Sequence, residues 1–155
     1  MRSHVTFTTR RFNQTEVHPH FINDCCFGED CIAWLVAELR ARGWSDLTEP
    51  WQEDWGWQTS GARDGRRYLL SVGLIPEEEP EWLVHVTERA PLLERLRGRG
   101  ALTVLPALAP ALHDVLRAAP DVHKVTWYYE EDLRRGASPG AVSPDAPRGA
   151  GESTT

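Results

Sequence analysis

Lysine is almost absent from this sequence. Lys124 is the single lysine among 155 residues, and 23 aspartates and glutamates give a formal net charge of −6. Proteins that bind nucleic acid neutralise phosphates with clustered basic side chains, and no segment here supplies a basic patch. We therefore expect no nucleic-acid partner. The acidic balance is compatible with a basic protein partner, although acidic surfaces most often serve solubility alone.

Long apolar runs are also missing. The longest, residues 32–37 and 101–105, fall far short of the roughly 20 residues that a membrane-spanning helix needs. Residues 1–9 carry polar and β-branched side chains, whereas a secretory signal has a basic start followed by an apolar run. We expect neither a membrane span nor export.

Cysteine occurs three times, at Cys25, Cys26 and Cys31. Three thiols cannot all pair, and two of these are neighbours in the sequence, which argues against a disulfide framework. This cysteine usage predicts a cytoplasmic protein.

The common catalytic motifs are missing as well. The sequence contains no glycine-rich phosphate loop, no zincin helix and no nucleophile elbow. We therefore predict no catalytic residue and no cofactor, and we favour a binding protein over an enzyme.

The apolar periodicity that is present predicts five strands and three helices. We expect strands around 4–12, 51–57, 67–74, 81–88 and 123–129, and helices around 29–42, 91–97 and 105–118. This order, β-α-β-β-β-α-α-β, predicts an α+β fold. The expected architecture is a two-layer sandwich, with the helices packed on one face of an antiparallel β-meander sheet.

The chain divides by composition near Leu133. Residues 1–133 are expected to form one globular domain. Residues 134–155 are dominated by Gly, Pro, Ser and Ala, a composition that buries too little apolar surface to offset the entropy lost on ordering. We predict a disordered C-terminal tail.

Two segments share a recognisable pattern: F-I-N-D-C-C-F-G-E-D-C-I-A-W-L at 21–35 and E-P-W-Q-E-D-W-G-W at 49–57. They resemble a family of small bacterial proteins, and the resemblance covers most of residues 20–130. Asp24 and Cys25 stand where that family has a proline-containing turn. The resemblance implies that both segments belong to one domain, and it implies no activity, substrate or ligand.

Tryptophan is abundant, with seven residues in the chain, and residues 44–57 combine four of them with acids and no Lys or Arg. A period of two places Trp51, Trp55 and Trp57 on one face of a strand, where Trp55 and Trp57 would fill the core under the first helix. Gly56 inside this strand predicts a bulge or a close approach by another backbone.

The alternative is that aromatic and acidic residues together bind a partner, because exposed Trp and Tyr dominate interface hot spots and acids steer basic proteins. The leading hypothesis is thus a protein-binding module, such as an inhibitor or immunity-type partner of a basic toxin or nuclease. The residues predicted to contact that partner are Trp51, Glu53, Asp54, Trp127, Tyr128, Glu130 and Glu131.

Competing hypotheses use the loop at 18–31, which contains two histidines and three cysteines. If the chain binds a metal, the ligands would be His18, His20, Cys25, Cys26 and Cys31. Their spacing lacks the paired knuckles of zinc sites, so we expect no stoichiometric zinc. A thiol enzyme would pair one cysteine with His20 or His85, but Glu29 and Asp30 oppose thiolate formation. A ligand-sensing domain with an aromatic pocket is the third hypothesis.

Overall fold

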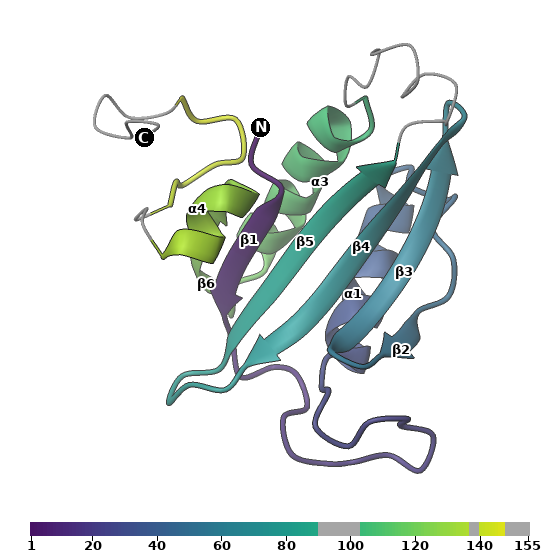
Figure 1. Ribbon diagram of the computed structural model, residues 1–155, viewed down its shortest axis with the longest axis vertical. Helices are drawn as coiled ribbons and strands as arrows, with labels where there is room; N and C mark the ends of the chain where they lie inside the picture. The colour runs from purple at the N-terminus through teal and green to yellow at the C-terminus, as the bar shows by residue number, and fades with distance from the viewer. Residues whose placement is uncertain (90–102, 137–139, 148–155) are drawn as a thin grey trace.

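The computed structural model describes residues 1–89, 103–136 and 140–147. Within them, six strands form one antiparallel sheet of order β2-β3-β4-β5-β1-β6 (Figure 1). The strands are β1 (His4–Thr8), β2 (Trp51–Glu53), β3 (Gly56–Arg63), β4 (Arg66–Ile75), β5 (Glu81–Arg89) and β6 (His123–Tyr128). The first and last strands of the chain thus pair side by side, and β1 closes the meander by pairing with β5.

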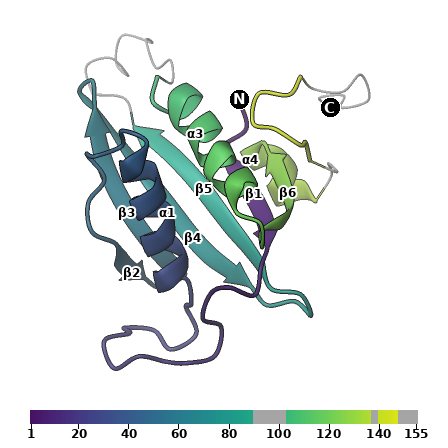
Figure 2. The same ribbon diagram turned by 180° about the vertical axis from the view of Figure 1, so that it is seen from behind.

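Two helices, α1 (Glu29–Ala41) and α3 (Leu105–Ala118), cover one face of this sheet (Figure 2). The predicted α+β fold, a sandwich of an antiparallel sheet and helices, is confirmed. A short helix that the sequence did not predict, α4 (Glu130–Arg135), follows β6 and lies on the other side of the sheet (Figure 1). The helix expected at 91–97 lies outside the described residues. No helix in the described part of the chain is both long and apolar enough to cross a bilayer.

The core lies between the sheet and the two long helices. In α1, Glu29 and Asp30 in the first turn complement the positive end of the helix dipole, and the buried stripe that begins at Cys31 faces the sheet. The largest fully buried side chains are Trp82, Trp127, Tyr68, Phe7, Ile32, Leu35, Leu39, Leu70, Leu108, Leu112, Leu116 and Val5.

A buried carboxylate ties β5 to the start of α3. The Glu88 side chain accepts hydrogen bonds from the backbone N–H groups of Thr103, Val104 and Leu105, and it lies 3.5 Å from the Arg66 guanidinium. These free N–H groups of a helix start need an acceptor, and α3 has no capping side chain of its own. Glu88 supplies it from the neighbouring strand.

The segment expected to be one strand at 51–57 is a hairpin. Strands β2 and β3 are joined by a turn at Asp54 and Trp55, so Glu53 pairs with Gly56 and Gln52 pairs with Trp57. The prediction that Trp51, Trp55 and Trp57 share one face is therefore wrong: Trp57 is 5% exposed, whereas Trp55 is 48% exposed. A turn breaks the period of two.

The close approach predicted at Gly56 is confirmed. A Cβ atom there would lie 2.2 Å from the carbonyl oxygen of Val72 on β4. Backbone atoms cannot yield as a flexible side chain can, so only glycine lets the hairpin close against β4 at this point.

The described residues after Leu133, 134–136 and 140–147, include contacts with the rest of the protein. Helix α4 ends at Arg135, and the Ala141 backbone exchanges hydrogen bonds of 2.7 and 2.8 Å with that of Trp127 on β6. Arg2 is buried beside this segment, and its backbone N–H donates to the Pro144 carbonyl. These contacts arise because the edge of β6 offers main-chain partners, and the disorder expected from composition for residues 134–155 stays a prediction. Residues 137–139 and 148–155 lie outside the described residues.

Candidate functional site

The face of the sheet opposite α1 and α3 carries a continuous row of side chains. The row takes one residue from each strand, and each is the direct cross-strand partner of the next. In spatial order the residues are Trp51, Gln58, Ser71, His85, His4 and Tyr128. Since successive side chains on a strand point to opposite faces, all six point away from the helical core. We call these residues the cross-strand row.

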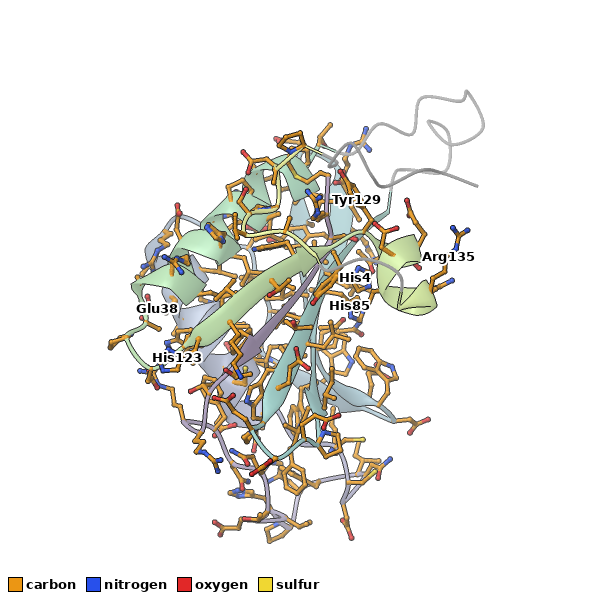
Figure 3. All side chains as sticks on the ribbon, turned by 90° about the vertical axis from the view of Figure 1, so that its left-hand side faces the viewer. His4, Glu38, His85, His123, Tyr129 and Arg135 are labelled. Atoms are coloured by element: carbon orange, nitrogen blue, oxygen red, sulfur yellow. The ribbon has the colours of Figure 1, made fainter. Side chains whose placement is uncertain are left out.

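Two imidazole rings occupy the middle of the cross-strand row. The rings of His4 and His85 are stacked, with centroids 5.2 Å apart and planes within 14°, and the Trp55 indole lies 5.5 Å from His85 on its other side. Figure 3 shows both histidines on the side of the sheet where α4 lies. Within the described residues, the His85 ring forms no hydrogen bond.

Burial favours the neutral form of both imidazoles. Burial and, to a smaller extent, the nearby His4 together lower the pKa of His85 to about 4, while Glu130 acts in the opposite direction. Burial also lowers the pKa of His4, whose Nδ1 is 3.0 Å from the Ser3 hydroxyl oxygen. A neutral imidazole has one N–H donor and one nitrogen acceptor. The His85 ring can therefore donate a hydrogen bond to a bound group or accept one from it.

A cavity of about 590 Å3 adjoins the two histidines. Its walls combine His4 and His85 with apolar Leu83 and with α4 residues that include Glu130 and Arg134. Glu130 and Arg134 form an ion pair of 2.5 Å, and more than half of each side chain is exposed. Polar and charged side chains make up about half of its lining, so a small ligand bound here would meet polar groups as well as apolar walls.

The hairpin at one end of the cross-strand row exposes two indoles. Trp51 is 36% exposed and donates from Nε1 to the Glu53 carboxylate at 2.6 Å, while Trp55 is exposed at the turn beside Asp54. Residues 44–57 contain no Lys or Arg. We call Trp51, Glu53, Asp54 and Trp55 the hairpin surface.

A hydrogen-bond network holds the hairpin against the loop that precedes α1. The Gln52 amide accepts from the backbone N–H of Ile22 and Asn23 and donates to the carbonyls of Asn23 and Cys26. The Trp57 indole N–H also donates to the Cys26 carbonyl, at 2.9 Å. These hydrogen bonds join the loop to the hairpin, and Ile22 is exposed on the loop.

The structure separates the residues predicted to contact a partner. Strands β2 and β6 are the two edges of the sheet, and inter-strand spacings of about 4.8 Å put these edges ~24 Å apart. Trp51, Glu53 and Asp54 lie at the β2 edge, and Tyr128, Glu130 and Glu131 lie at or after β6. Trp127 is fully buried beneath the helices and is not available to a partner.

Sequence reasoning left three residues out of the predicted surface: Trp55, His4 and His85. Trp55 was placed in the core, because the turn that exposes it was not recognised. The histidines alternate with Val5 and Val84, whose apolar character places His4 and His85 on the other face. That signal was present in the sequence, whereas the register that pairs the two histidines was not.

The loop at 18–31 does not bring its five predicted metal ligands into one set. His18 and His20 have ring centroids 5.6 Å apart, His20 pairs with Glu29 at 2.6 Å, and Cys31 is fully buried in α1. In the described part of the chain, no three His, Cys, Asp or Glu side chains lie close enough to hold a metal ion.

Cys26 and Cys31 are poor nucleophiles. Burial, a hydrogen bond with Cys25 and the nearby Cys25 and Asp54 raise the pKa of Cys26 to about 11. Burial and the adjacent Asp30 raise the pKa of Cys31 well above its usual value. Both groups are therefore thiols at neutral pH, and thiol catalysis needs the thiolate.

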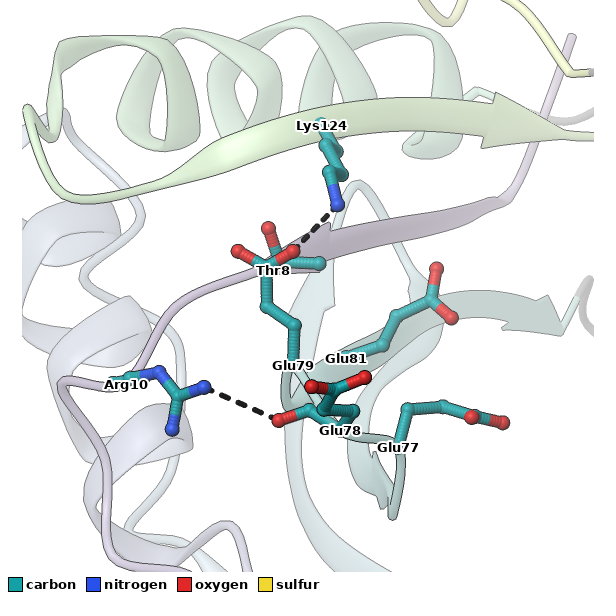
Figure 4. A pocket seen from close by; sticks show the side chains of 7 residues that line it. All are labelled: Thr8, Arg10, Glu77, Glu78, Glu79, Glu81 and Lys124. Atoms are coloured by element: carbon teal, nitrogen blue, oxygen red, sulfur yellow. Dashed lines mark hydrogen bonds and ion pairs between the residues drawn. The ribbon is translucent and has the colours of Figure 1, made fainter.

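A second hollow of about 590 Å3 lies at the turn between β4 and β5 and is lined mainly by carboxylates (Figure 4). Lys124 pairs with Glu79 at 2.5 Å, and Arg10 donates to the Glu78 carbonyl at 3.2 Å. Glu77 and Glu78 are exposed to solvent. The single lysine of the chain thus neutralises one carboxylate of a solvated acidic turn, which is a common surface arrangement.

No family model, curated protein or solved structure matches this chain. The candidate site is therefore assessed from its geometry alone.

Proposed function

We propose that this protein is a protein-binding module and that the hairpin surface binds a basic partner. The observation that carries this proposal is the exposure of Trp51 and Trp55, at 36% and 48%, on either side of two carboxylates. Exposed indoles provide most of the binding energy in many interfaces, and carboxylates beside them that form no ion pair within the described residues favour a positively charged partner.

The rigidity of the hairpin surface supports this role. Gly56 closes the hairpin against Val72, and the Gln52 amide ties it to the loop before α1. The Trp51 indole is held by Glu53. A surface that is already ordered loses little conformational entropy on binding, so more of the contact energy appears as affinity.

The partner class follows from charge. A net charge of −6, together with a hairpin surface that contains two carboxylates and no cation, suits a basic protein. An inhibitor or immunity-type protein that neutralises a basic toxin or nuclease has this character. The proposal extends the sequence hypothesis by selecting the β2 edge rather than the β6 edge.

The test is a comparison of captured proteins. The tagged chain, its Trp51→Ala/Trp55→Ala variant and a Glu131→Gln control at the opposite edge are used to purify partners from the native host at moderate salt. We expect a basic protein that the control retains and the double variant loses. Retention by the double variant and loss by the control would move the interface to the β6 edge, and an acidic partner would contradict the charge argument.

A second candidate function is small-ligand sensing, which the cavity beside His85 favours. The His85 edge has no hydrogen-bond partner in the described residues and adjoins about 590 Å3 of space. Indole and benzoate can be titrated while the ring-proton NMR signals of the histidines are followed. A saturable shift at His85 without one at exposed His123 would support a ligand site, and equal shifts at both would contradict it.

A further inference from the structure

We propose that Cys25 and Cys26 together form a two-thiol site for trivalent arsenicals, the soft species that need only two sulfur ligands from a protein. The proposal does not rest on the partner-binding function, although the two thiols adjoin the hairpin surface through the Asp54 carbonyl. Its two Sγ atoms lie 3.7 Å apart. Cys25 is exposed and Cys26 is buried directly behind it, so a small ligand reaches the pair from the Cys25 side.

The spacing of the sulfurs is the spacing of two ligands on one ion. A tetrahedral ion with metal–sulfur bonds of about 2.3 Å holds its sulfur ligands ~3.8 Å apart. The separation of 3.7 Å between the Sγ atoms of Cys25 and Cys26 is close to this value. Trivalent arsenic is pyramidal with narrower bond angles, so it holds two sulfurs slightly closer than a tetrahedral ion does, and the two thiols must approach each other slightly to share it.

Hydrogen bonds orient both thiols. The Cys25 S–H donates to the Asn23 side-chain oxygen, and the Cys26 S–H donates to the Asp54 carbonyl, each at 3.0 Å. Asn23 also donates to the same Asp54 carbonyl at 3.1 Å. The loop and the hairpin thus hold the dithiol from both sides, which reduces the entropy lost on chelation.

The number of available ligands favours a centre that needs only two ligands from the protein. Zinc in structural sites takes four protein ligands, and the described residues provide no group of three potential ligands. Cys31, the remaining thiol, is fully buried in α1. Thiol sulfur prefers soft ions, so a site with two sulfurs and no further ligand suits an arsenic centre whose other substituent is organic.

The reaction balances without an oxidant. With phenylarsine oxide, the arsenic–oxygen bond breaks and two arsenic–sulfur bonds form. The two thiol protons leave with the oxygen as water, and arsenic remains trivalent. The hydrogen bond from Cys26 to Asp54 is lost, so the adduct perturbs the turn that carries Trp55.

Phenylarsine oxide tests the site on the folded full-length chain. We expect native mass spectrometry to show one adduct per chain, with a change in tryptophan fluorescence, and reversal by a small dithiol but not by a monothiol. Cys25→Ser and Cys26→Ser should each weaken binding at least about 100-fold, the gain usual for a second tethered contact. Cys31→Ala should bind as the wild type does, and circular dichroism establishes that each variant is folded.

Three results would overturn the proposal. One is an adduct that forms only in denaturant, and another is unchanged affinity in either single-serine variant. The third is zinc bound stoichiometrically with the affinity of the arsenical, because that would show a larger ligand set than the two thiols.

Discussion

The two faces of the sheet are built from alternate residues of the same strands, and they differ in what covers them. On one face, apolar side chains such as Val5 and Val84 are fully buried under α1 and α3. On the other face, Ser71 is also fully buried although neither of those helices covers it. Its hydroxyl accepts a hydrogen bond from Gln58 at 2.9 Å, and His85 is its cross-strand neighbour. Side chains on the face opposite the long helices can therefore also be fully buried, as Ser71 is.

We infer that the helical face mainly determines the stability of the fold, whereas the opposite face is the one available for binding. The helical face stabilises the fold through apolar burial, which is non-directional. Removing buried volume from this face lowers the free energy of unfolding. The other face combines satisfied polar groups with two neutral imidazoles and the exposed indole of Trp55. We therefore expect substitutions on the first face to unfold the protein, and substitutions on the second to change binding or pH response.

The largest effect is expected at Trp57, on the helical face. Trp57→Ala removes a buried indole together with its hydrogen bond to the Cys26 carbonyl, and it should lower the free energy of unfolding by about 3–5 kcal/mol. Urea denaturation measures the change. Trp55→Ala is the matched control on the other face and should lower it by less than about 1 kcal/mol. Equal decreases in the free energy of unfolding for Trp57→Ala and Trp55→Ala would contradict the proposed difference between the two faces.

The next effect is a loss of stability in acid that arises from His85. The pKa of His85 falls from 6.5 to about 4 on folding, so the unfolded chain binds more protons between these values. Its contribution is complete above pH 6.5 and is lost as the pH falls toward 4. At about 1.4 kcal/mol per pKa unit, the loss is at most about 3 kcal/mol, and less where solvent reaches the ring.

Chemical denaturation at neutral pH and near pH 4.5 measures this loss. His85→Gln, which is uncharged at both values, should show a smaller fall in stability than the wild type. If the two falls are the same, His85 is not the titrating group.

A smaller effect on stability is expected from residues 140–147, which pair with the edge strand β6. Truncation after Gly136 removes the paired hydrogen bonds between Ala141 and Trp127 and the acceptors of Arg2. It should lower the free energy of unfolding by about 1–3 kcal/mol. Calorimetry measures it, and truncation after Pro147 serves as the control that should have no effect. A neutral result for both would show that residues 140–147 add nothing to stability.

The smallest effect on stability, with a clear effect on binding, is expected at Asp54 in the hairpin surface. Asp54→Asn should change the free energy of unfolding by less than about 0.5 kcal/mol, since the side chain is exposed. It should slow association with a basic partner, and the difference from the wild type should shrink as salt is raised. Stopped-flow mixing with the captured partner measures the rate. An unchanged association rate would remove Asp54 from the interface.

The sequence predicted the fold class and the positions of the two long helices. These features are local: the stripe from Cys31 to Leu39 repeats with the helical period, and Pro106 marks the start of α3. The break in the strand at Asp54 and Trp55 was missed, because Trp51, Trp55 and Trp57 lie an even number of residues apart and so keep a period of two through the turn. Helix α4 was missed because it buries no side chain.

The sequence by itself determined which residue types were available, their charge balance and the alternation that divides each strand between two faces. Only the tertiary structure decided which of them meet. His4 and His85 stack because β1 inserts between β5 and β6, and Cys26 reaches the Asp54 carbonyl because Gly56 lets the hairpin close on β4. Such pairings join residues far apart in the chain. Their register follows from the packing of the whole sheet and has no local signature in the sequence.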